Sequence, residues 1–161
     1  MSALRNMATV YLQYQGKVLM LYRKNSKVIS DSWIGSAGGH FEEWEVNDPK
    51  ACVLRELQEE LHMTQQDITD LQLRYICIRH VNDEIRINYY YFAELLKYKE
   101  DIPSQEGDTK WYVLNDIRSL NMPFTAKHMI DHYLSIGRHT THIYTGTAVE
   151  DHVVFTPLHI F

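Results

Sequence analysis

An amphipathic helix predicted over residues 48–61 restricts this chain to folds in which a helix covers a second layer of structure. Asp48 is a typical N-cap residue and Pro49 suits the first helical position, so the helix has a defined start. Apolar residues then recur with the helical period of about 3.6 as far as Leu61. One face of this helix must therefore be buried, and the rest of the chain has to supply the surface that buries it.

That surface is predicted to be a β-sheet, because runs rich in β-branched and aromatic residues lie on both sides of the helix. Two antiparallel hairpins are predicted: residues 7–14 and 17–23 around a turn at 15–16, and residues 71–81 and 84–95 around a turn at 82–83. We also expect a polar loop at 24–32, a strand at 110–114, a second helix at 125–136 that ends before Gly137, and short strands at 142–145 and 152–156. The sequence thus predicts one α/β domain over residues 1–161, with a mixed sheet covered by helices.

Length and composition exclude several classes of protein. The 161 residues suffice for one domain. The formal charge of −5 argues against a protein that grips long nucleic acid, which requires many Lys and Arg contacts to phosphates. No apolar run approaches the roughly 18 residues that a membrane span needs. Cys52 and Cys77 have neither a CxxC spacing nor a secretory leader ahead of them. We therefore expect a cytoplasmic monomer or homodimer with free thiols and no membrane partner.

Three glutamates, Glu56, Glu59 and Glu60, lie on neighbouring positions around the predicted helix. Like charges at such spacings cost roughly a few tenths of a kcal/mol each, and acids in the second half of a helix oppose its dipole. The cluster is either a solvated acidic stripe, with Arg55 and Glu59 as an i,i+4 pair, or the site of a hard cation. Mg²⁺ and Mn²⁺ prefer oxygen ligands and recruit substrate phosphates to complete their shell.

The residues in front of the helix favour the cation site, because the whole segment 39–63 resembles the Nudix box. In family notation this box is G-x5-E-x7-R-E-U-x-E-E-x-G-U, where U is aliphatic. The matching positions are Gly39, Glu45, Arg55, Glu56, Leu57, Glu59, Glu60 and Met63. Nine residues separate Glu45 from Arg55 where the box has seven, and His62 stands where the box has glycine. The insertion precedes the N-cap, and a left-handed helix end is open to His at some cost.

This resemblance implies a Nudix fold, in which a mixed sheet lies between helices (α/β/α), and hydrolysis of a diphosphate linkage. It implies that Glu56, Glu59 and Glu60 bind Mg²⁺ or Mn²⁺ directly or through water. It further implies that Arg55 steers a carboxylate and that the Gly38 carbonyl adds a metal ligand.

Glu106 is the candidate for a further metal ligand or general base, since residues 105–111 resemble the loop that supplies this group in the family. The alternative interpretation is that Glu106 is an ordinary surface acid in a polar loop. Either Glu60 or Glu106 could take the proton of the attacking water.

The second hairpin predicts a binding face without reference to any family. If Asn82 and Asp83 form a two-residue turn, one face carries the pairs Arg79 with Arg86, Cys77 with Asn88, and Tyr75 with Tyr90. Facing arginines are unfavourable unless an anion joins them, so this face, with Asn88 and Tyr90, predicts contacts to a nucleotide. The alternative is a solvent-facing sheet on which the arginines splay apart. The opposite face, with Ile76, Ile78, Ile85, Ile87 and Tyr89, is predicted to be core, and Arg23 is a further candidate for a phosphate contact.

Among Nudix enzymes the chain most resembles the MutT-type nucleoside triphosphate pyrophosphohydrolases, including those that clear oxidised guanine nucleotides. The resemblance rests on residues 33–35, on Glu106 and Gly107, and on the C-terminal β-runs. Some of these enzymes read the oxidised base with acids ahead of the last helix, and residues 122–125 contain none. Two alternatives remain: a hydrolase of a nucleoside diphosphate linked to a sugar, an alcohol or an RNA 5′ end, and a Nudix module that senses a nucleotide without cutting it.

Overall fold

The computed structural model describes residues 1–23 and 31–159, so most of the polar loop expected at 24–32 lies outside the described residues. The strands are β1 (Ala3–Tyr14), β2 (Lys17–Arg23), β3 (Ser32–Ile34), β4 (Ala37–His40), β5 (Ile68–Val81), β6 (Glu84–Leu95), β7 (Asp108–Val113), β8 (Tyr144–Val149) and β9 (His152–Pro157). The helices are α1 (Pro49–Leu61) and α2 (Phe124–Ser135), with short 3-10 turns η1 (Glu43–Glu45), η2 (Gln65–Asp67), η3 (Leu114–Ser119) and η4 (Gly137–His139).

The described strands form one mixed sheet in the order β3-β2-β1-β6-β5-β8-β9, with β4 added beside β1 and β7 beside β2. Two of the pairings are parallel, β1 with β6 and β5 with β8. The pairings within the two predicted hairpins are antiparallel, as expected. Gln15 and Gly16 turn the first hairpin with φ angles of 45° and 78°, the left-handed backbone that a two-residue turn requires. The mixed sheet predicted from the sequence is confirmed.

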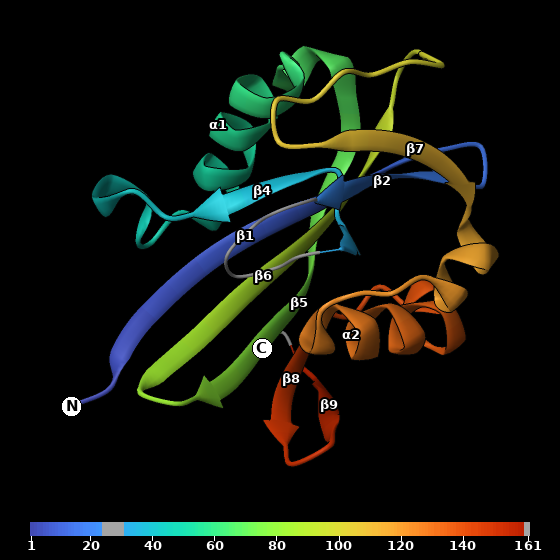
Figure 1. The fold of residues 1–161 in the computed structure, drawn as a ribbon. Helices are drawn as coiled ribbons and strands as arrows, with labels where there is room; N and C mark the ends of the chain where they lie inside the picture. Colours follow the sequence, from blue (N-terminus) through green and yellow to red (C-terminus); the bar gives the residue numbers. More distant parts are fainter. Residues whose placement is uncertain (24–30, 160–161) are drawn as a thin grey trace.

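Each face of the sheet is covered by one helix, which confirms the α/β/α arrangement (Figure 1). On one face, Val53 and Leu57 of α1 pack with Val10 of β1 in the first core cluster. On the other face, Met129 and Ile130 of α2 pack with a set of aromatic residues of the sheet, namely Tyr11, Tyr75, Tyr90 and Phe92. Cys52 and Cys77 are buried free thiols, one in each cluster. None of the described helices is long and apolar enough to cross a membrane.

The register of the second hairpin agrees with the prediction, since Arg79 pairs with Arg86, Cys77 with Asn88 and Tyr75 with Tyr90. The prediction that the opposite face is core was wrong at the tip of the hairpin. Ile78 is 40% exposed and Ile85 is 37% exposed. The reason is that the hairpin extends beyond the part of the sheet that α1 covers, as Figure 1 shows. The face of the hairpin that carries Tyr75 and Tyr90 is more deeply buried than the isoleucine face, because α2 packs on it.

Candidate active site

Helix α1 begins and ends as the sequence predicts. The side chain of Asp48 accepts a hydrogen bond from the Ala51 amide at 3.1 Å, and Pro49 occupies the first turn. His62 ends the helix in the left-handed conformation, with φ 55° and ψ 34°, and its amide donates to the Gln58 carbonyl. His62 therefore takes the left-handed position at the helix end where the Nudix box has glycine. The acidic residues of α1 stay in helical register.

Strand β4 brings Gly38 and Gly39 under the acidic side of α1. The strand pairs with β1, so that Gly38 lies opposite Thr9 and Gly39 opposite Ala8. A Cβ atom on Gly38 would lie 2.6 Å from the Ala8 carbonyl oxygen, and one on Gly39 would overlap with the Glu56 carboxylate. Backbone atoms thus exclude a side chain at Gly38, whereas a side chain at Gly39 would displace the Glu56 carboxylate.

Arg55 holds three acidic side chains of this region. Its Nε and Nη2 bind the two carboxylate oxygens of Glu45 at 2.6 and 3.0 Å, and its Nη1 lies 2.8 Å from Glu56 Oε1 and 3.0 Å from Glu59 Oε2. Glu45 is fully buried, and the hydrogen bonds from Arg55 lower the pKa of its carboxyl. The two-residue insertion therefore leaves Glu45 opposite Arg55, and Arg55 acts as a positioning residue for Glu56.

Glu56 and Glu60 are buried carboxylates, 8% and 6% exposed. Burial raises the pKa of Glu60 to about 8, with a further contribution from the charge of Glu56, and burial also raises the pKa of Glu56. One amide, that of Gly38, donates to Glu60 at 3.3 Å. Two desolvated acids side by side are unfavourable as anions, and a hard divalent cation would relieve that cost. The donor set therefore fits Mg²⁺ or Mn²⁺.

Glu59 differs from its two neighbours. Its side chain is 57% exposed and bound to Arg55, and it does not line the cavity described below. Within residues 1–23 and 31–159, no three His, Cys, Asp or Glu side chains are placed together so that they could hold a metal. The structure thus brings Glu56 and Glu60 together and leaves Glu59 beside them on the surface.

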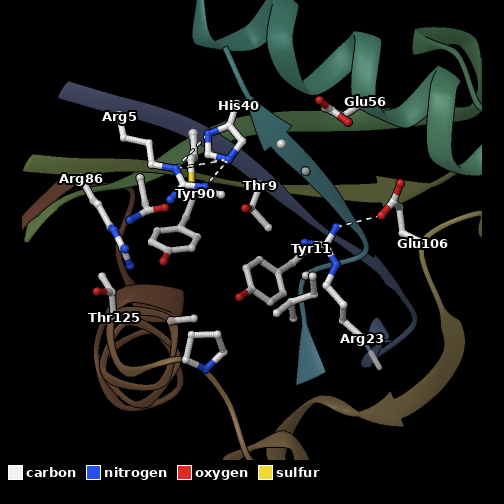
Figure 2. A pocket seen from close by; sticks show the side chains of 18 of the residues that line it. Arg5, Thr9, Tyr11, Arg23, His40, Glu56, Arg86, Tyr90, Glu106 and Thr125 are labelled. Carbon is white, nitrogen blue, oxygen red and sulfur yellow. Dashed lines mark hydrogen bonds and ion pairs between the residues drawn. The ribbon is translucent and has the colours of Figure 1, made fainter. Parts of the chain in front are cut away.

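A cavity of about 600 Å³ opens between the β4–α1 region and the start of α2 (Figure 2). This volume is typical of a site for a small molecule. Apart from Glu59, every predicted site residue lines it: Arg23, Gly38, Arg55, Glu56, Glu60, Arg79, Arg86, Asn88, Tyr90 and Glu106. The residues predicted as catalytic and those predicted to bind substrate therefore share one cavity.

Glu106 faces this cavity, where it forms an ion pair with Arg23 at 3.1 Å (Figure 2). It lies on the loop before β7, and its side chain is 46% exposed. The charge of Glu106 also contributes to the raised pKa of Glu60. Arg23, predicted as a phosphate contact, binds a carboxylate in this structure.

Several lining residues were not found from the sequence: Arg5, Met7, Thr9, Tyr11 and His40. The β1 residues among them alternate with a period of two, which marks one face of a strand. That period identifies the face, but the placement of β1 beside β6 depends on a long-range parallel pairing.

Gly39→Ala is expected to lower kcat roughly a hundredfold, because the new methyl group would push the Glu56 carboxylate away and a shift of about 1 Å in a catalytic group has this effect. The measurement is steady-state hydrolysis by protein shown to be folded by circular dichroism. Gly16→Ala is the matched control: it strains a turn with φ 78° far from the cavity, so it should lower stability and leave kcat intact. Wild-type kcat in Gly39→Ala would show that Glu56 does not depend on this contact.

The chain was compared with known families and structures. Residues 4–133 match the model of the NUDIX domain family. No curated protein matches the chain. Similar solved structures include the mutator MutT protein from Bacillus halodurans, with a TM-score of 0.62, 18% identity, and coverage of 95% of this chain and 97% of that one. They also include a NUDIX hydrolase from Alicyclobacillus acidocaldarius (TM-score 0.67, 10% identity, 85% and 94% coverage) and an Ap4A hydrolase from C. elegans (0.62, 15%, 86% and 99%). At these identities the likeness shows a shared fold.

Proposed function

The chain belongs to the Nudix family of diphosphate hydrolases, and from this premise we propose that it cuts the diphosphate linkage of a small nucleotide with the help of Mg²⁺ or Mn²⁺. The substrate would be a nucleoside triphosphate or another nucleoside diphosphate derivative. The observation that carries the proposal is the pair of buried carboxylates, Glu56 and Glu60, beside the glycines of β4 at one end of a cavity of nucleotide size.

The residues at the end of the cavity beside β4 would have different roles in hydrolysis. Glu56 and Glu60, with the Gly38 carbonyl, would hold the cation, and Glu59 would contribute through water. A Mg²⁺ or Mn²⁺ ion held there would neutralise charge on the diphosphate and make the attacking water more acidic. Arg55 keeps Glu56 in place through the hydrogen bond at 2.8 Å.

In the reaction the water oxygen forms a bond to phosphorus while the bridging P–O bond breaks and its electron pair leaves with the second phosphoryl group. The proton of the water passes to a carboxylate at the cavity wall, and Glu60 and Glu106 are the two candidates. Arg23 would stabilise negative charge on the phosphates once it is released from Glu106.

The finer assignment is MutT-like hydrolysis of a nucleoside triphosphate, including removal of oxidised guanine nucleotides such as 8-oxo-dGTP. The similar solved structures include a MutT protein and an Ap4A hydrolase, so a dinucleotide substrate is the second candidate. Equal turnover of 8-oxo-dGTP and dGTP would refute the oxidised-base hypothesis. We also propose a cytoplasmic location, because both cysteines are free thiols.

A panel of nucleotides incubated with Mg²⁺ or Mn²⁺ tests the function. We expect a nucleoside phosphate product, complete loss of hydrolysis in EDTA, and recovery when either metal is added back. Hydrolysis in ¹⁸O-labelled water, followed by mass spectrometry of both products, shows which phosphorus is attacked. The absence of hydrolysis across triphosphates, nucleotide sugars, dinucleotides and capped RNA with both metals would contradict the proposal and favour a nucleotide-sensing module.

A further inference from the structure

The cavity has a second end that the proposed hydrolysis does not use. Gly38 lies opposite Thr9 of β1, and Arg5 is four residues further along the same strand. At about 3.3 Å per residue the two Cα positions are separated by about 13 Å. The same cavity therefore has space on the Arg5 side for a part of the substrate that is not cut.

Three arginines form one row across three adjacent strands at this second end. Arg5 of β1 pairs with Arg86 of β6, and Arg86 pairs in turn with Arg79 of β5. All three line the cavity, and Figure 2 shows Arg5 and Arg86 at its edge. Neighbouring strands are about 4.8 Å apart, and like charges at that spacing repel one another. We refer to Arg5, Arg86 and Arg79 as the arginine row.

The protein supplies less negative charge than this row requires. Glu84 lies 2.8 Å from Arg86 Nε and 3.5 Å from Arg5 Nη1, so one carboxylate serves two guanidinium groups. Arg79 instead lies over the ring of Phe124, with its guanidinium carbon 4.2 Å from the ring centroid. Among the described residues Arg79 has no carboxylate within ion-pair distance. Within the described part of the chain, these three positive groups thus share one carboxylate, and Arg5 also donates a hydrogen bond to His40 at 3.2 Å.

Two further groups of donors face the same space. The first turn of α2 lines the cavity, and no side chain caps its amides, so this helix end favours an anion. Tyr11 is 1% exposed and Tyr90 is 5% exposed, yet both line the cavity, and neither hydroxyl bonds to another residue that the structure describes. In Figure 2 both hydroxyls point into the cavity, on the side of Thr125. A tyrosine hydroxyl that faces a cavity can donate a hydrogen bond to an anion bound there.

We propose that the substrate carries a second anionic group of the phosphate class, remote from the diphosphate that is cut, and that this group binds between the arginine row and the first turn of α2. The proposal rests on the proposed hydrolase function and narrows its substrate class to nucleotides with a further phosphate. A nucleoside triphosphate with a neutral base at this end would add no negative charge to that of Glu84, which the arginine row already shares. The absence of acids in residues 122–125 agrees with this assignment, since acids there would repel the anion.

Titration with inorganic phosphate in EDTA tests the site itself without catalysis. We expect saturable shifts in the ¹⁵N NMR signals of the Arg79 and Arg86 side chains and of the Thr125 and Ala126 amides. Arg79→Gln should weaken phosphate binding about tenfold, as the loss of a charge-assisted hydrogen bond does, and Arg79→Lys should retain most of it. Arg118→Gln is the matched control, because Arg118 is exposed and lies outside the cavity. Shifts confined to other regions, or equal weakening in both Gln variants, would overturn the proposal.

A pair of substrates tests whether the proposed second anion site is used when a nucleotide is hydrolysed. ADP and adenosine 3′-phosphate 5′-diphosphate differ by one remote phosphate, and we expect the second to have at least a tenfold higher kcat/KM with Mg²⁺. Arg79→Gln should abolish this preference by raising KM without changing kcat. Hydrolysis of nucleotides without any preference for the extra phosphate would overturn the inference and leave the proposed function standing. Failure to hydrolyse any nucleotide would refute the function, while the phosphate titration would still decide whether the site exists.

Discussion

Glu60→Gln is expected to lower kcat roughly a thousandfold while the protein remains folded. Glutamine has nearly the shape of glutamate but lacks the charge that would hold a divalent cation at the reacting phosphates. Metal-based stabilisation of the transition state amounts to several kcal/mol, and each 1.36 kcal/mol is a factor of ten in rate. Glu60 is 6% exposed and lines the cavity, so the substitution removes a carboxylate from the place where the cation would bind. Steady-state kinetics at saturating Mg²⁺ measures the effect.

The three acids of α1 should differ in this experiment. Glu56→Gln should match the loss at Glu60, since both carboxylates are buried at the cavity. Glu59→Gln should lose about tenfold or less, because the Glu59 side chain is 57% exposed and bound to Arg55. Glu43→Gln, an exposed acid outside the cavity, is the control for the loss of one charge. A Glu60→Gln variant that keeps a tenth of the wild-type kcat, or a Glu59→Gln variant more damaged than it, would contradict the assignment.

The second large effect is expected on stability. Arg55→Ala should lower the free energy of unfolding by about 3–5 kcal/mol, the usual cost of leaving a buried charge without its partner. The charge in question is Glu45, which is fully buried and bound by two nitrogens of Arg55. Urea unfolding followed by circular dichroism measures the loss. Arg118→Ala removes an exposed arginine and should change stability by about 0.5 kcal/mol or less.

The same ion pair predicts how stability depends on pH. Arg55 lowers the pKa of Glu45 in the folded protein, so the unfolded chain binds more protons below the ordinary pKa of 4.5. The stabilisation is therefore present above about pH 4.5 and is lost as the pH falls through the lowered pKa. Replacement of Glu45 and Arg55 together by Leu and Met should remove this part of the acid sensitivity and recover most of the stability lost in Arg55→Ala. A double variant no more stable than Arg55→Ala would refute the pairing argument.

The features that the sequence predicted well are local ones. The N-cap at Asp48, the helix end at His62 and the register of the second hairpin all follow from residues that are close in the chain. The choice between Glu59 and Glu60 was beyond such reasoning, because the two are adjacent on the helix and only the tertiary packing buries one of them. The exposure of Ile78 and Ile85 was missed for a related reason: alternation separates two faces of a strand but does not say how far a covering helix extends.

Of the residues at the second end of the cavity, those on β5 and β6 were predicted from the sequence and those on β1 were not. Arg79, Arg86, Asn88 and Tyr90 were found because a tight turn fixes their pairing. Arg5 and Tyr11 were missed because they join the same surface only through the parallel pairing of β1 with β6. No turn links these two strands, so the sequence offers no local signal for their register.

The parallel pairing of β1 with β6 also affects how the protein is made. Arg5 leaves the ribosome about eighty residues before its neighbour Arg86, and α2, which closes the cavity, follows later still. The backbone N–H and C=O groups on the β6 side of β1 therefore have no strand to pair with until more than half of the chain has been synthesised. A nascent chain truncated before β6 would have the complete Nudix box and no cavity, and its β1 edge would be free to pair with other chains.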